Sequence, residues 1–331
     1  MSDPILVPGP RLEPIISPTG EPVPVTLLTG FLGAGKTTLL NRILNGDHGL
    51  KVGVLVNDFG AINIDAELIE GVTENTISLT NGCICCEIRE DLITSLEELL
   101  DGNRDVEYVI LEASGIADPE TVVTTFSDAK YEELLRLDSV TCVIDAEAVF
   151  ADGDNAALAV LKLRQIGFAD LVIVNKVDLV PEEALPVIHE WINRLLREVR
   201  ILDAEYCDVP LAVLLSVGRF DPQLVNREGN GETHGHAPGF ETWHYNSSEP
   251  MSIGELRDAI RKLPASVYRS KGFVYDAERP DERLVLQSVG RRTSVTQLGT
   301  WSDRTPQTDL VVIGTDLDTE RLQRAFDACR S

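Results

Sequence analysis

Residues 30–38 read GFLGAGKTT, and this stretch constrains the fold more than any other feature of the chain. It matches G-x-x-x-x-G-K-[ST] and lies between an apolar run and an amphipathic segment, so it predicts a phosphate-binding loop between a strand and a helix. Glycines let such a loop turn its backbone N–H groups toward phosphate oxygens. We expect Lys36 to reach the β- and γ-phosphates and the Thr37 hydroxyl to be a ligand of Mg²⁺. The residues expected to contact the nucleotide here are Gly30, Gly33, Ala34, Gly35, Lys36, Thr37 and Thr38.

From Val23 onward, short runs rich in Val, Ile and Leu alternate with longer amphipathic segments. This alternation is typical of strands that are buried on both faces and joined by crossover helices. The runs expected to be strands are VPVTLLTG, KVGVLVNDF, VEYVILEASG, SVTCVIDAE, LVIVNKVDL and PLAVLLSVG. The segments expected to be helices include EIREDLITSLEELL and PEEALPVIHEWINRLLREV. The pattern predicts an α/β fold with a doubly wound, mostly parallel sheet.

A second region with a different order of elements begins near Phe240, after a polar stretch that contains Gly and Asn. Its expected elements are, in order, a strand at FETWHYN, a helix at SIGELRDAIRKL, strands around SKGFVYDA, RLVLQSVG, TSVTQLG and DLVVIGT, and a helix at TERLQRAFDACR. This order predicts a smaller α+β domain. The expected division is a Pro-containing tail at 1–22, a P-loop domain at 23–217, a linker at 218–239 and the C-terminal domain at 240–331.

The tetrapeptide Asn175-Lys176-Val177-Asp178 directly follows the apolar run LVIV. It therefore lies at the carboxyl end of an expected strand, which is where α/β sheets bind their ligands. A carboxylate at Asp178 can accept hydrogen bonds from guanine N1–H and from the exocyclic amine, a donor pattern that adenine lacks. We therefore expect Asn175, Lys176 and Asp178 to contact the base, and GTP to be the nucleotide.

Two acidic residues close other expected strands. Asp58 stands in NDFG after the second strand, and Glu112 stands in EASG after the third. Either carboxylate can hold Mg²⁺ through water or orient the attacking water, and the N–H of Gly115 can donate to the γ-phosphate. We expect Lys36, Glu112 and Asp58 to be the catalytic residues, with Thr37 and Asp58 near the metal.

The segment Asn81-Gly82-Cys83-Ile84-Cys85-Cys86 places three thiols within four residues. Thiolates at Cys83, Cys85 and Cys86 can converge on one soft or borderline cation such as Zn²⁺, and three sulfurs leave a tetrahedral shell one ligand short. Because the segment lies between the two acidic residues above, a loop that moves with the γ-phosphate can also reshape the metal shell. The alternative is that these cysteines are structural. His234 and His236 are more typical of a solvated loop than of a metal site.

Charge and targeting signals exclude several classes of partner. Residues 240–331 hold 13 Lys and Arg against 14 Asp and Glu, so nearly all of the net charge of −25 falls on residues 1–239. Nucleic acid is a poor partner for such a surface. The sequence shows neither a signal peptide nor a run of about 20 apolar residues that could cross a bilayer, so we expect a cytoplasmic protein without a membrane partner.

The motifs GFLGAGKTT, NDFG, NGCICC, EASGIADPE and NKVD occur in this order, and SVYRSKGFV follows in the second region. With these motifs the chain resembles the CobW-like family of P-loop GTPases, from about residue 23 to the end. The resemblance implies a slow GTPase that binds Zn²⁺, or Co²⁺ or iron in some members, at the cysteine motif. It also implies delivery of the metal to a client metalloprotein or a cofactor-assembly pathway. This chain departs from the family at Asp58 and Ala61, where the family usually has glutamates.

Two rival functions remain open on the sequence alone. A P-loop kinase for small molecules would use the same phosphate loop but transfer the γ-phosphate to a metabolite. A nucleotide-gated interaction protein would have no role in metal handling. The oligomeric state is also open, a homodimer included.

Overall fold

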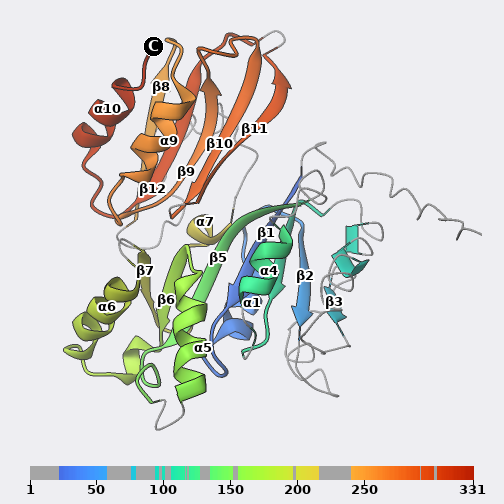
Figure 1. The fold of residues 1–331 in the computed structure, drawn as a ribbon, viewed down its shortest axis with the longest axis vertical. Helices are drawn as coiled ribbons and strands as arrows, with labels where there is room; N and C mark the ends of the chain where they lie inside the picture. The colour runs from blue at the N-terminus through green and yellow to red at the C-terminus, as the bar shows by residue number, and fades with distance from the viewer. Residues whose placement is uncertain are drawn as a thin grey trace, which may run out of the picture.

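In the computed structural model, the described residues form two β-sheets, one parallel and one antiparallel (Figure 1). It describes residues 22–57, 76–79, 94–96, 99–100, 106–115, 117, 119–126, 135–151, 156–196, 199–215, 240–290, 292–301 and 304–331. The antiparallel sheet lies above the parallel one in this view, and the short helix α7 lies between them. The expected linker at 218–239 and nearly all of the expected tail lie outside the described residues.

The parallel sheet has seven strands in the order β3-β2-β4-β1-β5-β6-β7. Every neighbouring pair is parallel, and β1 lies at the centre between β4 and β5. The strands are β1 (Val23–Thr29), β2 (Val52–Asn57), β3 (Thr76–Leu79), β4 (Tyr108–Glu112), β5 (Leu135–Asp145), β6 (Leu171–Asn175) and β7 (Arg200–Ala204). Because all strands run the same way, their carboxyl ends meet at one edge of the sheet.

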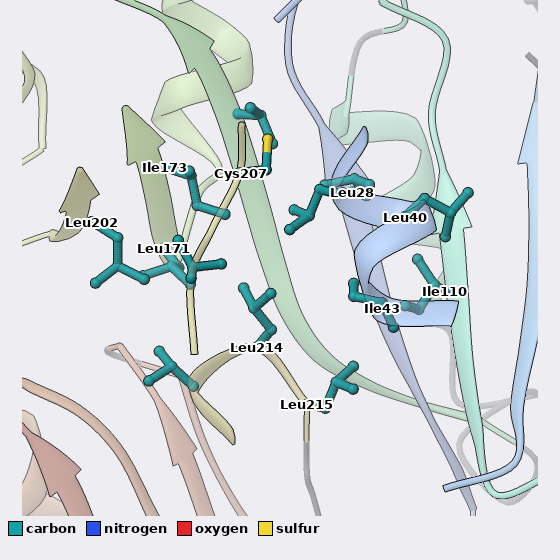
Figure 2. Packing of buried hydrophobic residues seen from close by; sticks show 14 of the residues in the cluster. Leu28, Leu40, Ile43, Ile110, Leu171, Ile173, Leu202, Cys207, Leu214 and Leu215 are labelled. Atoms are coloured by element: carbon teal, nitrogen blue, oxygen red, sulfur yellow. The ribbon is translucent and has the colours of Figure 1, made fainter. Parts of the chain in front are cut away.

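Helices cover both faces of this sheet, because its strands are apolar on both sides. The helices are α1 (Lys36–Asn45), α4 (Pro119–Phe126), α5 (Ala156–Gly167), α6 (Ala184–Leu195) and α7 (Leu211–Leu214). On one face, Leu40 and Ile43 of α1 and Leu214 of α7 pack with strand residues such as Leu28 and Ile173 (Figure 2). The other face packs against α4, α5 and α6. The predicted doubly wound parallel sheet is confirmed.

The strand predicted at PLAVLLSVG is wrong. Leu211–Leu214 form the helix α7 directly after Pro210, and Val213, Leu214 and Leu215 are almost completely buried. A short apolar run that is buried on all sides has no periodicity by which strand and helix can be told apart. The sheet gains β3 and β7 instead, which were not predicted.

The C-terminal sheet is antiparallel, with the order β11-β10-β9-β12-β8. Two helices pack on one of its faces. Each begins at a polar cap, because Ser252 accepts from the N–H of Glu255 and Asp318 accepts from the N–H of Arg321. The elements are β8 (Glu241–Ser247), α9 (Ile253–Arg261), β9 (Val267–Tyr275), β10 (Glu282–Val289), β11 (Arg292–Thr300), β12 (Thr308–Gly314) and α10 (Thr319–Asp327), in the predicted order.

The motif RSKGF lies on β9, and its glycine has a structural reason. A Cβ atom on Gly272 would lie 1.9 Å from the carbonyl oxygen of Asp309 on the neighbouring strand β12. No side chain fits at this distance, so the close approach of the two backbones requires glycine. The arginine of the same motif, Arg269, is almost completely buried, and its guanidinium donates to Asp138 of the parallel sheet.

Candidate functional site

The phosphate-binding loop connects β1 to α1, as predicted. Gly30, Gly33 and Gly35 have φ angles of 134°, 77° and 114°, which L side chains rarely adopt. Space also excludes a side chain: a Cβ atom on Gly30 would lie 2.1 Å from the Val143 carbonyl oxygen, and one on Gly35 would lie 2.4 Å from Nδ2 of Asn175. The loop therefore packs so tightly over β5 and β6 that only glycine fits at these two positions.

Lys36 and Thr37 form the start of α1, and Glu112 ends the adjacent strand β4. The Lys36 ammonium lies 3.4 Å from the carbonyl oxygen of Phe31, within the loop. The Thr37 hydroxyl donates to Oε1 of Glu112 at 3.3 Å. A hydroxyl beside a carboxylate is an all-oxygen donor set, which suits a hard cation such as Mg²⁺. Thr38 is exposed on the surface of α1.

The NKVD segment starts at the end of β6 and continues into the 3₁₀ turn η1 (Val177–Leu179). The Asn175 side chain donates to the carbonyl of Ala34 at 2.9 Å, so it ties the NKVD segment to the phosphate-binding loop. Lys176 has a φ of 65° and its ammonium pairs with Oδ2 of Asp145 at 2.5 Å. Asp178 is exposed.

A loop after β7 completes this edge of the sheet and was not predicted from the sequence. The N–H of Cys207 donates to Oδ1 of Asn175 at 2.7 Å, and its thiol lies 3.3 Å from the carbonyl oxygen of Gly35. Arg42 of α1 donates to the carbonyl of Tyr206 at 2.7 Å and to Asp208 at 2.8 Å. The loop is thus tied to the phosphate-binding loop, to Asn175 and to α1.

Gly115 follows the end of β4 and lies against the phosphate-binding loop. A Cβ atom on Gly115 would lie 2.7 Å from the backbone nitrogen of Leu32. The buried side chain of Gln165 on α5 donates to the Gly115 carbonyl at 3.0 Å. This bond ties the backbone at Gly115 to α5.

A mostly apolar pocket lies beside the loop on the α5 side of the sheet. The Lys162 ammonium lies 5.0 Å from the centre of the Phe31 ring and donates to the carbonyl of Ala148 at 3.1 Å. The pocket is lined by Phe31, Leu32, Ala34, Cys142, Ile144, Asp145, Ala148, Val149, Lys162, Gln165, Ile166 and Trp191. Three of these residues, Phe31, Leu32 and Ala34, belong to the phosphate-binding loop.

Four predicted site residues lie outside the described residues, namely Asp58, Cys83, Cys85 and Cys86. Ala61, His234 and His236 also lie outside them. Within the described ranges, no group of three His, Cys, Asp or Glu side chains forms a metal site. The described cysteines are also poor ligands, because burial raises the pKa of Cys142 and Cys207 to about 12 and that of Cys329 to about 11. Among the described helices, none has the length and apolarity to span a bilayer.

Of two further residues at this edge of the sheet, Asp145 could have been found from the sequence and Cys207 could not. Asp145 ends the apolar run SVTCVID, so the rule that pointed to Glu112 and Asn175 also points to Asp145. Cys207 carries no motif, and its role follows only from the turn of the chain after β7.

Two family profiles match the chain. The profile "CobW/HypB/UreG, nucleotide-binding domain" matches residues 24–203, and "Cobalamin synthesis protein cobW C-terminal domain" matches residues 240–330. Zinc-regulated GTPase metalloprotein activator 1 of Dictyostelium discoideum is 33% identical over 327 residues, covering 85% of this chain and 69% of that protein.

Bacterial relatives match over nearly their whole length. Zinc chaperone YjiA of Escherichia coli (strain K12) is 32% identical over 326 residues, which cover 94% of this chain and 99% of that protein. The crystal structure of Zn(II)-bound YjiA GTPase from E. coli has 26% identity and a TM-score of 0.45, covering 94% and 100% of the two chains. With one profile on more than half of its residues and relatives of this similarity, the chain belongs to the CobW/HypB/UreG family and carries the CobW C-terminal domain.

Proposed function

We propose that this chain is a GTP-hydrolysing metallochaperone that binds Zn²⁺ at Cys83, Cys85 and Cys86 and delivers it to a client metalloprotein. The observation that carries the nucleotide part is the meeting of the phosphate-binding loop, the Thr37–Glu112 pair and Asn175 at one edge of the sheet. The names of the relatives, zinc chaperone and zinc-regulated GTPase metalloprotein activator, support the metal part.

In the proposed reaction, the loop N–H groups and the Lys36 ammonium hold the β- and γ-phosphates of GTP. Phosphoryl transfer to water needs positioning and charge stabilisation more than covalent help from the protein. Mg²⁺ supplies positive charge at the phosphates when bound, and Thr37 with Glu112 would hold it. The Glu112 carboxylate, with Asp58, orients the attacking water, and the N–H of Gly115 donates to the γ-phosphate.

Base selection is assigned to Asp178. Its exposed carboxylate lies in the η1 turn at the carboxyl end of β6, next to Lys176 and Asn175. A carboxylate accepts two hydrogen bonds from the guanine N1–H and amine, and it repels the N1 lone pair of adenine. The fixed Asn175 and Lys176 side chains keep the turn in place for this recognition.

Zn²⁺ is the cargo in this proposal, and Co²⁺ or Fe²⁺ are the competing cargoes. Thiolates favour soft and borderline cations, and three of them leave one position of a tetrahedral shell for a transfer partner. The cysteine motif lies in the chain between Asp58 and Glu112, the two residues assigned to the reacting phosphate. Loss of the γ-phosphate would thus move the segment that carries the thiols and weaken the hold on the metal.

The proposed partner is a client metalloprotein or a cofactor-assembly protein in the cytoplasm, and it binds to the C-terminal domain. That domain is nearly neutral, whereas residues 1–239 carry almost all of the net charge of −25. A neutral surface avoids the long-range repulsion of acidic clients that the first domain would exert.

A titration of Zn²⁺ against the purified protein, with either GDP or a non-hydrolysable GTP analogue bound, tests the proposal. The two nucleotides should give zinc affinities that differ about tenfold or more, and zinc should change nucleotide affinity by the same factor, because coupling between sites is reciprocal. The same titration with Co²⁺ and Fe²⁺ identifies the preferred cargo.

Two variants serve this titration. The double variant Cys85→Ser/Cys86→Ser should lose zinc and keep GTP binding, whereas Cys329→Ser should keep both. Equal zinc affinities in both nucleotide states, or unchanged zinc content in the double variant, would instead indicate an interaction protein with structural cysteines. GTP turnover that requires an added metabolite would indicate a kinase.

A further inference from the structure

A buried ion pair joins the C-terminal sheet to the parallel sheet. The guanidinium of Arg269 on β9 lies 2.7 Å from Oδ2 of Asp138 on β5. The two side chains are only 3% and 1% exposed. Two charges at this depth are tolerated only with good geometry and further hydrogen bonds, so the pair marks a constrained joint.

Hydrogen bonds connect Asp138 to two more strands. Tyr108 on β4 donates its hydroxyl to Oδ2 of Asp138 at 2.8 Å, and the same hydroxyl lies 2.6 Å from Oγ1 of Thr26 on β1. Thr26 in turn lies 2.9 Å from Oγ of Ser139 on β5. One arginine of the C-terminal domain thus connects to the three central strands of the parallel sheet.

The network keeps its charges at neutral pH. Burial alone would raise the pKa of Asp138, but the guanidinium groups of Arg269 and Arg136 hold that pKa well below its usual range. Burial and the Asp138 carboxylate raise the pKa of Tyr108, so its hydroxyl stays protonated and donates. The contact of Arg269 with Asp138 is therefore ionic, and Tyr108 is the donor in its hydrogen bond with Asp138.

The three connected strands carry the nucleotide site at their other ends. β1 ends at Thr29, directly before the phosphate-binding loop, β4 ends at Glu112, and β5 ends at Asp145, the partner of Lys176. Along a strand each residue advances about 3.3 Å, so the network lies roughly 10 to 25 Å from these ends. The register of β1 against β4 sets the distance between Thr37 and Glu112. The bond between Thr26 and Tyr108 adds a side-chain link between these two strands to their backbone pairing.

We propose that Arg269 is a positioning residue for GTP turnover, which holds β1, β4 and β5 in the alignment that brings Glu112 to Thr37. This inference rests on the proposed GTPase function and adds its regulation: the C-terminal domain sets the nucleotide site through one side chain. A client that binds this domain and displaces β9 changes turnover, and the nucleotide changes the stability of β9 in return, because the coupling is reciprocal.

Three variants and one matched control test the proposal by steady-state kinetics with GTP. Arg269→Met should lower kcat about tenfold or more and leave KM within about twofold, because misalignment affects the transition state more than nucleotide binding by the loop. Tyr108→Phe, which removes only the hydroxyl, should lower kcat severalfold. Arg269→Lys keeps the charge without the planar fork and should fall between them.

The control is Arg292→Met. Arg292 also pairs across the two sheets, at 2.8 Å from Asp170 in the turn before β6. Asp170 accepts from the N–H of Val140 on β5, so this pair reaches β5 but is not part of the Tyr108–Thr26 link between β4 and β1. This variant should keep kcat and KM. Wild-type kcat in folded Arg269→Met, or an equal loss in Arg292→Met, would overturn the assignment to this network. If Arg269→Met does not fold, the kcat values of Tyr108→Phe and Arg269→Lys test the proposal instead. Both substitutions preserve most of the volume of the side chain.

Hydrogen exchange of the β9 amides gives a readout that does not depend on turnover. A saturating non-hydrolysable GTP analogue should slow exchange in β9 of the wild type and of Arg292→Met, but not of Arg269→Met. Absence of a nucleotide effect on wild-type β9 would refute the inference even in an active GTPase. If the wild type binds GTP without hydrolysing it, the proposed function fails, and the exchange measurement still decides the inference.

Discussion

The hydroxyl of Thr37 lies 3.3 Å from Oε1 of Glu112, which joins the first turn of α1 to the carboxyl end of β4. The two residues are 75 positions apart in the sequence and come together because β4 is the direct neighbour of β1. In the proposed function, this pair lies where a cation and a water molecule would be held against the γ-phosphate.

Replacing Glu112 by Gln should therefore abolish most of the chemistry. Glu112→Gln keeps the size of the side chain and removes its charge, so GTP affinity should change little while the rate of phosphate release falls about 100-fold or more. Single-turnover phosphate release together with nucleotide-binding titrations checks this.

The matched control is Glu120→Gln on α4, an exposed residue whose ion pair with Arg164 lies on the surface. This variant should behave as the wild type. Normal turnover in Glu112→Gln would indicate that Asp58, and not Glu112, is the catalytic carboxylate.

Asp178→Asn should change which base the protein accepts. The amide of Asn offers a donor where guanine presents its own amine, so GTP affinity should fall about 100-fold, a loss typical of one charge-assisted hydrogen bond replaced by two facing donors. ATP affinity should change little, and xanthosine triphosphate, which carries an oxygen in place of that amine, should bind better than to the wild type. Competition with a fluorescent nucleotide measures all three.

For base selection, Glu182→Gln is the control, since Glu182 is an exposed acid shortly after η1. Its nucleotide preference should be that of the wild type. Equal losses of GTP and ATP in Asp178→Asn would mean that Asp178 supports the turn and does not contact the base.

Thiol reactivity should separate the six cysteines into two groups. Cys142, Cys207 and Cys329 are buried, and their pKa values of about 12, 12 and 11 leave almost no thiolate at pH 7, so they should react slowly. Cys83, Cys85 and Cys86 should react quickly with a thiol reagent, and one equivalent of Zn²⁺ should protect all three. Fast reaction of these three in the presence of zinc would contradict the assigned metal site.

Acid should weaken the joint between the two sheets. The pKa of Asp138 in the folded protein lies below its ordinary value of 3.8, so the unfolded chain binds the proton more readily. The stability that this pair contributes is thus complete above about pH 5 and is lost as the pH falls below 3.8 toward the folded pKa. Asp138→Asn should lower the free energy of unfolding by about 3 kcal/mol at pH 7 and show a smaller further loss in acid.

Denaturant unfolding at a series of pH values measures this difference. The control is Asp258→Asn, because Asp258 is exposed and its ion pair with Arg261 at 3.6 Å lies on the surface of α9. That variant should follow the wild type at every pH. An Asp138→Asn curve parallel to the wild type would exclude an ionised Asp138 in the folded protein.

The sequence predicts best those parts of the site that depend on local geometry. The phosphate-binding loop and NKVD follow from short spacings, because the chain itself places the glycines, Lys36 and Asp178 relative to a strand end. The order of elements in the C-terminal domain is also local, since alternating polarity and the caps at Ser252 and Asp318 are visible residue by residue.

Contacts between distant segments could not be predicted in the same way. Arg269 and Asp138 are 131 positions apart, and neither stands in a pattern that names its partner. The run PLAVLLSVG failed for a related reason: its residues Val213, Leu214 and Leu215 are buried in a core cluster that also contains Tyr268 of the C-terminal sheet, so burial and not periodicity selected them. Cys207 reaches Asn175 only because β7 lies beside β6.

The two hydrogen bonds of Asn175, to Ala34 and to Cys207, have a kinetic consequence. They tie the phosphate-binding loop, the NKVD turn and the loop after β7 to one another by protein contacts alone, so we expect association with GTP to have little ordering entropy to overcome. Capture of GTP from the medium should then be rapid, and the lifetime of the product complex should set the pace of each cycle.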